Sequence, residues 1–320
     1  MPSLRSTAVA IVGFTAAVWA LPAQPKFSSG QMKIYEYSKR QNAAAAALGL
    51  TDIDILQFAL TLEWLETSFY QQGFAKFPQS DFLSLGLTQQ QFDDLVGVGA
   101  SEATHVSLLQ SAIAQNGVKP VEPCTYDFNF TDAKSMITTA AVLENIGVSA
   151  YLGGSPLISS PSILSTAASI LTFEARHQTF VRVATAAAAA PGAFDTALSP
   201  KQVFSLAAPF IQSCPTGSNL ILTPFPSLAM ATGAQAVAAA GQMINLESSV
   251  SASAQFCAFT NGNILGGTAF SAFKPGQGCT VPGQGEIAGI VYVNLATQAP
   301  LSGIITDDII VAGPMVLQIS

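Results

Sequence analysis

Both histidines of this 320-residue chain follow a glutamate by three positions: Glu102 precedes His105, and Glu174 precedes His177. On an α-helix, residues three apart lie on one face about one turn apart. Each Glu-x-x-His frame can therefore direct a carboxylate and an imidazole toward one point. With nine glutamates in the chain, composition alone gives both frames in roughly one sequence in a thousand. The two frames therefore predict a metal site held between helices.

Four long segments have the apolar spacing of three and four residues that is typical of helices. They run from about residue 51 to 73, 88 to 116, 131 to 154 and 160 to 190. Each opens near a Ser, Thr or Asp that can cap the first turn, and each ends at or before Gly or Pro. The Glu-x-x-His frames fall in the second and fourth segments.

The connections between these segments predict how they pack. The first and third connections are short, which favours antiparallel neighbours. Residues 117–130 form the second connection, which contains two prolines, and fourteen extended residues span at most about 46 to 50 Å. A 28-residue helix is about 42 Å long, so this segment can cross the whole length of a bundle. We therefore expect a four-helix bundle of two antiparallel hairpins joined by a long crossover.

A di-metal site in such a bundle needs one more glutamate from each of the remaining two helices. The third segment contains a single glutamate, Glu144, and the first contains Glu63 and Glu66. All the candidates lie near the middle of their helices, as convergence on one point requires. The predicted metal ligands are Glu63, Glu102, His105, Glu144, Glu174 and His177.

Two tyrosines support this choice. Tyr70 follows Glu63 by seven residues and Tyr151 follows Glu144 by seven, so each pair shares a helix face. A tyrosine there can donate a hydrogen bond to a ligand carboxylate or act as a one-electron donor, so both are candidate catalytic residues. The alternative is that both are core residues with satisfied hydroxyls. The tyrosine spacing favours Glu63 over Glu66, which would then be an outer residue of the site or exposed.

The charge of the predicted site indicates two divalent cations. Four glutamates contribute four negative charges, which would repel one another and lose solvation in a bundle core. Two divalent ions neutralise them. Oxygen-rich ligation with one imidazole per ion suits iron or manganese better than a closed tetrahedral zinc site.

Beyond about residue 220 the helical pattern gives way to short β-rich stretches broken by Gly and Pro, which indicates a small antiparallel β-sandwich. The expected organisation is a signal peptide over residues 1–23, an irregular lead-in over 24–50, the four-helix bundle over 51–192, a linker with a short helix over 193–225, and a β-rich C-terminal domain over 226–320.

The first residues predict secretion. Arg5 precedes an apolar stretch, residues 8–21, that is too short to span a bilayer, and small residues follow as cleavage sites. A retained anchor is the alternative, and no later segment is predicted to insert into a membrane. The four cysteines allow three pairings, and proximity in sequence favours Cys124 with Cys214 and Cys257 with Cys279.

The net charge of −7 and the lack of a basic stripe in the sequence argue against a nucleic-acid partner. Only 10% of residues are charged, so an uncharged polar surface is expected, which fits a cell-wall or extracellular-matrix partner. The oligomeric state stays open.

The stretch from Asp54 to Tyr70, with both Glu-x-x-His frames and Glu144, resembles the ferritin-like proteins grouped with plant desiccation-related and fungal stress-responsive or sexual-development proteins. The alanine-rich chain, the leader and the β-rich tail are similar to the secreted fungal branch. The resemblance covers roughly residues 49–190. It implies a di-metal bundle and supplies no reaction, because this bundle hosts many activities.

Two functions follow as hypotheses. One is a di-iron or di-manganese oxidoreductase acting on ferrous iron, oxygen or peroxide. The alternative is a secreted stress-protective or cell-wall-associated protein whose metal site is structural or vestigial. An iron-storing cage fits less well, because the C-terminal tail would obstruct the packing of a shell.

Overall fold

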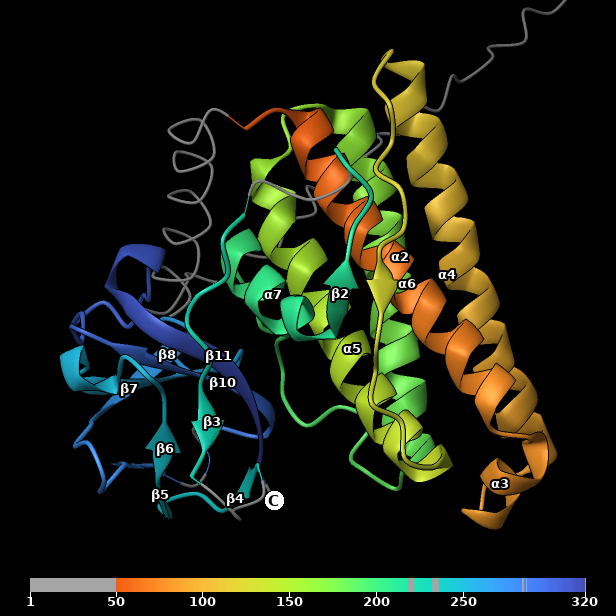
Figure 1. The fold of residues 1–320 in the computed structure, drawn as a ribbon. Helices are drawn as coiled ribbons and strands as arrows, with labels where there is room; N and C mark the ends of the chain where they lie inside the picture. The colour runs from red at the N-terminus through yellow and green to blue at the C-terminus, as the bar shows by residue number, and fades with distance from the viewer. Residues whose placement is uncertain (1–49, 218–221, 232–235, 284, 286, 320) are drawn as a thin grey trace, which may run out of the picture.

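The computed structural model describes residues 50–217, 222–231, 236–283, 285 and 287–319. The predicted signal peptide and nearly all of the lead-in lie outside the described residues. Figure 1 shows a group of long helices with a β-rich unit beside it. The predicted order of helices followed by a β-rich region is therefore confirmed.

Four long helices form the helical part: α2 Asp52–Lys76, α4 Gln89–Gln115, α5 Ala133–Gly154 and α6 Pro161–Ala184. Their first turns are capped as the sequence indicates. Thr51 and Asp132 each accept a hydrogen bond from the backbone three residues on, which satisfies an amide that the helix itself cannot. Helix α6 ends before the alanine run that favours helix, because Ala186 adopts a positive φ of 60°.

The long helices pack as two pairs, α2 with α4 and α5 with α6 (Figure 1). The first connection contains a short helix, α3 Gln79–Ser84, which the periodicity did not predict. Between the pairs, the chain from α4 to α5 runs along the helices in extended form, as its length predicted. Its strand β1 Thr125–Tyr126 pairs with β2 Ile211–Ser213. The disulfide Cys124–Cys214 joins the residues next to these two strands and so links the same two segments covalently.

The segment after α6 returns to the helices. Helix α7 Pro200–Ala207 contacts both α5 and the strand β11, so it lies at the junction of the helical and β-rich parts. The described residues also form short 3₁₀ helices: η1 Ser155–Leu157, η2 Ala208–Phe210, η3 Ser251–Ser253 and η4 Asp307–Ile309.

The β-rich part is built on a five-stranded sheet in the order β4-β11-β10-β7-β8, with β3–β6 and β5–β9 as two-stranded ribbons. Its buried strand β10 pairs antiparallel with β7 and β11. The second disulfide, Cys257–Cys279, also forms as predicted, whereas the sandwich arrangement stays a prediction. The strands are β3 Ala229–Met230, β4 Val237–Ala238, β5 Met243–Ile244, β6 Leu246–Glu247, β7 Phe256–Thr260, β8 Thr268–Ala272, β9 Cys279–Thr280, β10 Gly289–Ala296 and β11 Ile310–Ile319.

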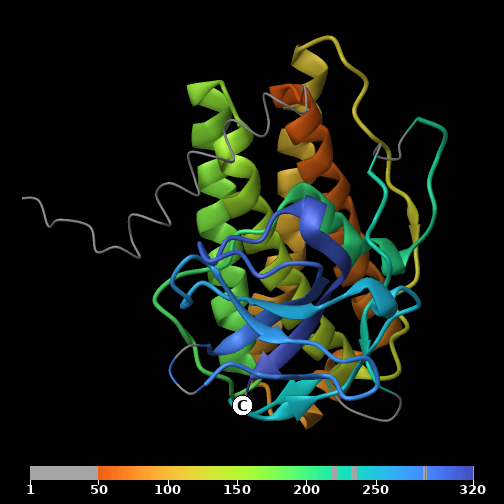
Figure 2. The same ribbon diagram turned by 90° about the vertical axis from the view of Figure 1, so that its left-hand side faces the viewer.

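A buried polar contact joins the two parts, which overlap in the view of Figure 2. The Tyr292 hydroxyl of β10 accepts a hydrogen bond of 2.6 Å from Asn145 Nδ2 and donates one of 3.1 Å to the Asn145 carbonyl oxygen. Ser149 Oγ lies 2.9 Å from the same hydroxyl. Tyr292 is completely buried, so this contact fixes the sheet against α5.

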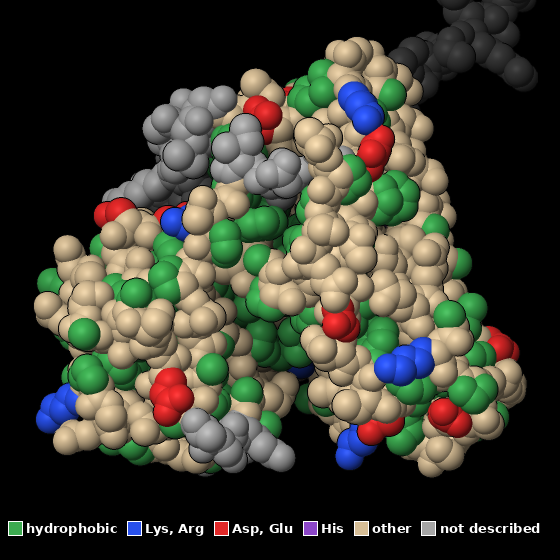
Figure 3. Space-filling model, viewed as in Figure 1, with side chains coloured by type: hydrophobic (Ala, Val, Ile, Leu, Met, Phe, Trp, Pro, Cys, Tyr) green, Lys and Arg blue, Asp and Glu red, His purple; other side chains and the backbone are tan. Residues whose placement is uncertain are grey.

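Charged side chains are sparse on the face drawn in Figure 3, as the composition predicted. A hollow between the β-rich part and the helices is visible on this face, with hydrophobic side chains along it. Among the described residues, no helix combines the length and apolar character needed to cross a membrane.

We expect Tyr292→Phe to lower the free energy of unfolding by about 1 to 3 kcal/mol, because it leaves the buried Asn145 amide without its acceptor. Urea denaturation followed by circular dichroism measures the change. Tyr126→Phe, which removes a single hydrogen bond of 3.2 Å from the Cys124 amide, is the matched control. It should cost less, because Tyr292 makes two hydrogen bonds with Asn145. Equal stability of Tyr292→Phe and the parent would contradict this account of the junction.

Candidate metal centre

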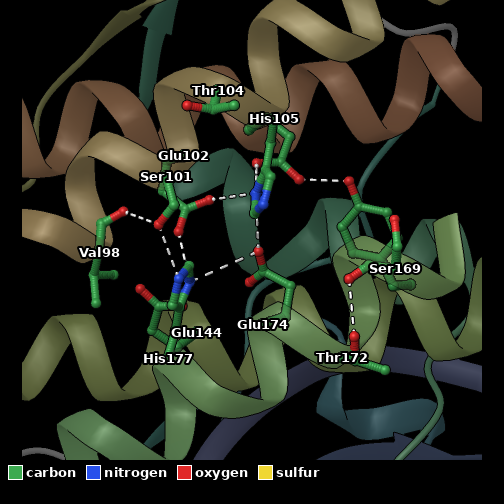
Figure 4. Close-up of polar contacts among 12 residues, drawn as sticks. Val98, Ser101, Glu102, Thr104, His105, Glu144, Ser169, Thr172, Glu174 and His177 are labelled. Carbon is green, nitrogen blue, oxygen red and sulfur yellow. Dashed lines mark hydrogen bonds and ion pairs between the residues drawn. The ribbon is translucent and has the colours of Figure 1, made fainter. Parts of the chain in front are cut away.

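The six side chains predicted as ligands lie together in the middle of the four long helices. Glu63 comes from α2, Glu102 and His105 from α4, Glu144 from α5, and Glu174 and His177 from α6. In Figure 4, the carboxylates of Glu102 and Glu174 lie between the imidazoles of His105 and His177. Helical spacing explains this directly, since each Glu-x-x-His frame presents both of its side chains on one face.

The side chains form two overlapping groups that could each hold a metal ion. One group is Glu63, Glu102, His105 and Glu174, and the other is Glu102, Glu144, Glu174 and His177; within each group the candidate ligand atoms lie within 4.8 Å of one another. Glu102 and Glu174 belong to both groups. Each group adds one further carboxylate and one imidazole, which gives the cluster an approximate twofold symmetry.

The two shared glutamates face both imidazoles. Glu102 places Oε2 3.0 Å from His105 Nδ1 and Oε1 2.7 Å from His177 Nδ1. Glu174 Oε1 lies 3.4 Å from His105 Nδ1 and 4.0 Å from His177 Nδ1. Both imidazoles thus turn the same nitrogen, Nδ1, toward the carboxylates. Ser101 Oγ lies 3.0 Å from His177 Nε2 on the outer side of that ring.

Several buried atoms of the cluster make no hydrogen bond of good geometry among the described residues, although all of them except Glu174 Oε2 lie within 4.0 Å of an ion-pair partner. They are Glu102 Oε1, Glu144 Oε2, both carboxylate oxygens of Glu174, and His177 Nδ1. The four glutamates are completely buried, so these atoms cannot turn to water. Buried carboxylates of this kind are destabilising unless a proton or a cation satisfies them. The donor set therefore fits a group of positive charge at the centre.

Burial raises the pKa of three of these carboxylates. The pKa of Glu63 rises to about 7, and those of Glu144 and Glu174 also rise, with the charge of Glu102 adding to the effect. Glu102 is the exception. Burial raises its pKa too, but hydrogen bonds from His105 and His177 outweigh burial and lower it to about 2. Glu102 is thus the carboxylate that stays charged between the two rings.

The pKa values of both imidazoles are raised, although burial alone would lower them. Burial lowers the pKa of His105, but its contacts with Glu102, Glu174 and Glu63 prevail and raise it to about 12. The same balance, with Glu102 and Glu144 as the acceptors, raises the pKa of His177 to about 10. Without a metal ion, protonated imidazoles neutralise part of the carboxylate charge. A metal ion must displace those protons, because it binds imidazole only in the deprotonated form.

Both candidate tyrosines contact the cluster, each through the opposite helix. Tyr70 of α2 donates a hydrogen bond to Glu144 Oε1 of α5, and Tyr151 of α5 donates one of 2.5 Å to Glu63 Oε1 of α2. The sequence placed each tyrosine on the face of its own glutamate and did not foresee this exchange. Burial raises the pKa of both phenols well above the usual value, so they remain donors.

Glu66 is the acidic residue whose position the sequence left open. It is buried, and burial together with Glu174 raises its pKa well above the usual value. It belongs to neither ligand group, although it lies close by. A Cβ atom on Gly147 would lie 3.0 Å from Glu66 Oε1 and 2.5 Å from Glu174 Oε2. The absence of a side chain at Gly147 thus makes room for both carboxylates.

Phe173 is a further residue that sequence reasoning missed. Its ring packs edge-on against His105 and His177, with centroid distances of 6.1 and 5.1 Å. Phe173 is 41% exposed, so it lies between the imidazoles and solvent. Its position four residues before His177 was the available signal, because that spacing stacks side chains on one helix face.

We expect Gly147→Ala to reduce the bound metal, because its Cβ would displace the Glu174 carboxylate. Gly97→Ala is the matched control. It also lies within a long helix, and its Cβ would meet nothing within 4 Å. The control should gain about 1 kcal/mol of stability from helix propensity and keep its metal content. Metal analysis by mass spectrometry and thermal unfolding measure both effects, and a Gly147→Ala variant with full metal content would contradict the account.

Comparison with known proteins agrees with this geometry. Residues 51–187 match the model of the ferritin-like domain, which spans the four long helices and every candidate ligand. Over 178 residues the chain is 28% identical to Protein rds1 of Schizosaccharomyces pombe. That alignment covers 55% of this chain and 44% of the relative, so less than half of the relative's length is matched. The helical part of this chain is a ferritin-like domain, and a β-rich C-terminal region follows it.

Proposed function

We propose that the ferritin-like domain holds two divalent metal ions, iron or manganese, bridged by carboxylates. The observation that carries the proposal is the sharing of Glu102 and Glu174 between two groups of potential ligands. In this assignment Glu63 and His105 complete one site, and Glu144 and His177 complete the other. Glu66 stays outside both sites as a buried neighbour.

Charge and donor type support two such ions. Four glutamates can supply four negative charges, which two divalent cations balance. Each ion would meet three carboxylates and one imidazole, an oxygen-rich set that suits iron or manganese better than zinc. The tyrosine hydrogen bonds to Glu63 and Glu144 fix the orientation of one carboxylate at each site.

The function that this centre supports best is oxidoreductase chemistry on oxygen, peroxide or ferrous iron. A bound pair of redox-active ions supplies the electron transfer and the open coordination positions. The protein's own residues restrict what can approach. A cavity of about 10 Å³, roughly the size one water needs, lies beside Glu66 and Gly147. None of the six candidate ligands lines this cavity, and it is too small for an organic substrate.

A secreted, stress-protective protein with a structural metal site is the second candidate. The two disulfides support an oxidising location, and the complete burial of the carboxylates suits a structural ion. In an extracellular location, the partner in this second proposal would be the cell wall or the extracellular matrix. A structural ion predicts that metal-loaded protein consumes neither peroxide nor oxygen, while chelation lowers its melting temperature.

The stoichiometry of bound metal tests the two-ion assignment. We expect about two ions per chain after expression in iron- and manganese-replete medium. Glu144→Ala should reduce this to about one, because Glu144 belongs to one group, whereas Glu102→Ala should remove both. Glu247→Ala, an exposed glutamate of β6, is the control and should change nothing. A parent protein that contains neither metal, or an equal loss in both site variants, would defeat the assignment.

The tyrosines test the redox hypothesis separately. We expect Tyr70→Phe and Tyr151→Phe each to lower peroxide or oxygen consumption, or metal affinity, by about 10- to 100-fold, because each removes a hydrogen bond that orients a ligand. Oxygen-electrode and peroxide assays at fixed metal content separate turnover from affinity. Tyr126→Phe serves as the control. Unchanged turnover in both variants would exclude a catalytic role for the tyrosines.

A further inference from the structure

Two adjoining cavities lie between α6 and the β-rich part, outside the metal centre. The larger has a volume of about 560 Å³ and the smaller about 130 Å³. Residues from both parts line both cavities, including Ala175 of α6, Asp195 of the following segment and Asn261 beside β7. The two cavities therefore adjoin along shared lining residues, and we treat them as two compartments of one candidate site.

The smaller compartment contains an unsatisfied arginine. Arg182 of α6 is 7% exposed, and its Nε has no hydrogen-bond partner in the described part of the chain. Its Nη2 donates a hydrogen bond of 3.1 Å to Asn145 Oδ1, and no described acidic residue lies within ion-pair distance of the guanidinium. Asp195 is the nearby charge that influences it, without direct pairing. A buried guanidinium left in this state is destabilising, and an anion beside it would remove that penalty.

The larger compartment is mostly apolar. Leu152, Leu171, Phe194, Ile264 and Ile305 contribute hydrocarbon surface to it. Its volume lies within the range of small-molecule sites, which are typically apolar with a few placed polar groups. An apolar compartment beside a cavity that contains one cation without a direct ion pair is suited to a molecule with a single charged end.

We propose that this site binds a small organic monocarboxylate, with the carboxylate on Arg182 and the apolar body in the larger compartment. The planar guanidinium matches a carboxylate in shape and forms charge-assisted hydrogen bonds with it. Among the residues that the structure describes, no second Arg or Lys lines either compartment, so a phosphate dianion would lack a balancing charge. Asp195, which lines both compartments, further disfavours a second negative charge.

The site reaches the back of the metal-ligand helices. Asn145, which follows Glu144, accepts hydrogen bonds from both Gln178 and Arg182, and Gln178 follows His177. The proposed ligand would therefore rest on residues that hold α5 and α6 together. The inference does not depend on the proposed metal chemistry, because every residue it uses lies outside the two ligand groups.

Isothermal titration calorimetry of the full protein with octanoate tests the proposal. We expect saturable binding of one octanoate per chain, with much weaker binding of octanol, which lacks the charge, and of inorganic phosphate, which lacks the apolar body. Arg182→Gln should weaken octanoate binding by about 10- to 100-fold, the value of a charge-assisted hydrogen bond. Arg176→Gln is the matched control, because Arg176 lies on the same helix over the exposed Phe173 ring and lines neither cavity.

Two further variants distinguish a loss of octanoate binding from a loss of folding. Leu152→Trp fills the larger compartment without touching Arg182, and it should also abolish octanoate binding while circular dichroism stays unchanged. Asp195→Asn should tighten binding, because it removes a like charge. Equal affinity for octanol and octanoate, or octanoate binding that survives both Arg182→Gln and Leu152→Trp, would overturn the proposal.

Discussion

The burial of four carboxylates around one point is the constraint on which the helical domain depends. Like charges in a core repel one another and lose their hydration, so an apolar bundle tolerates them only when protons or cations compensate. In this structure, both imidazole and phenol groups compensate the carboxylates. The imidazoles of both Glu-x-x-His frames lie against the carboxylates, and two phenols donate to the outer ones. The pKa shifts of opposite sign in Glu102 and Glu174 follow from how many donors each one reaches.

The exchange of hydrogen bonds between α2 and α5 follows from the same constraint. Tyr70 and Tyr151 each lie two turns beyond the glutamate of their own helix, and in antiparallel helices that offset brings each phenol to the glutamate of the other. Each phenol thus ties its own helix to the ligand of its neighbour. Gly147 completes the arrangement, since only a residue without a side chain leaves space for the carboxylates of Glu66 and Glu174. The cluster therefore dictates residue size as well as residue charge.

The sequence predicted those features that depend on local periodicity. Helical spacing and caps located the four long helices, and the Glu-x-x-His frames with Glu63 and Glu144 identified the side chains that converge. The sequence did not predict the features that depend on contacts between helices. These are the burial of Glu66, the partner of each tyrosine, and the position of Phe173 over the imidazoles. The short helix α3 and the end of α6 also escaped, because Pro78 and Ala186 set those boundaries through backbone conformation rather than through apolar pattern. Alternation in the tail indicated strands but carried no information on how the ribbons pack.

The junction with the β-rich part shows how a peripheral unit can influence the cluster without contacting it. Asn145 lies next to Glu144 on α5, and it meets Tyr292 of β10 with its amide nitrogen and Gln178 and Arg182 of α6 with its amide oxygen. One side chain thus couples the sheet to both helices of a hairpin that supplies three of the six candidate ligands. Because a hydrogen-bonded network in a buried region restricts the movement of its members, a shift of β10 would strain the positions of α5 and α6 together. The β-rich part is therefore connected to the ligand-bearing helices through hydrogen bonds at one face of the hairpin, and the Nε of Arg182 is the atom of that network without a hydrogen bond among the described residues.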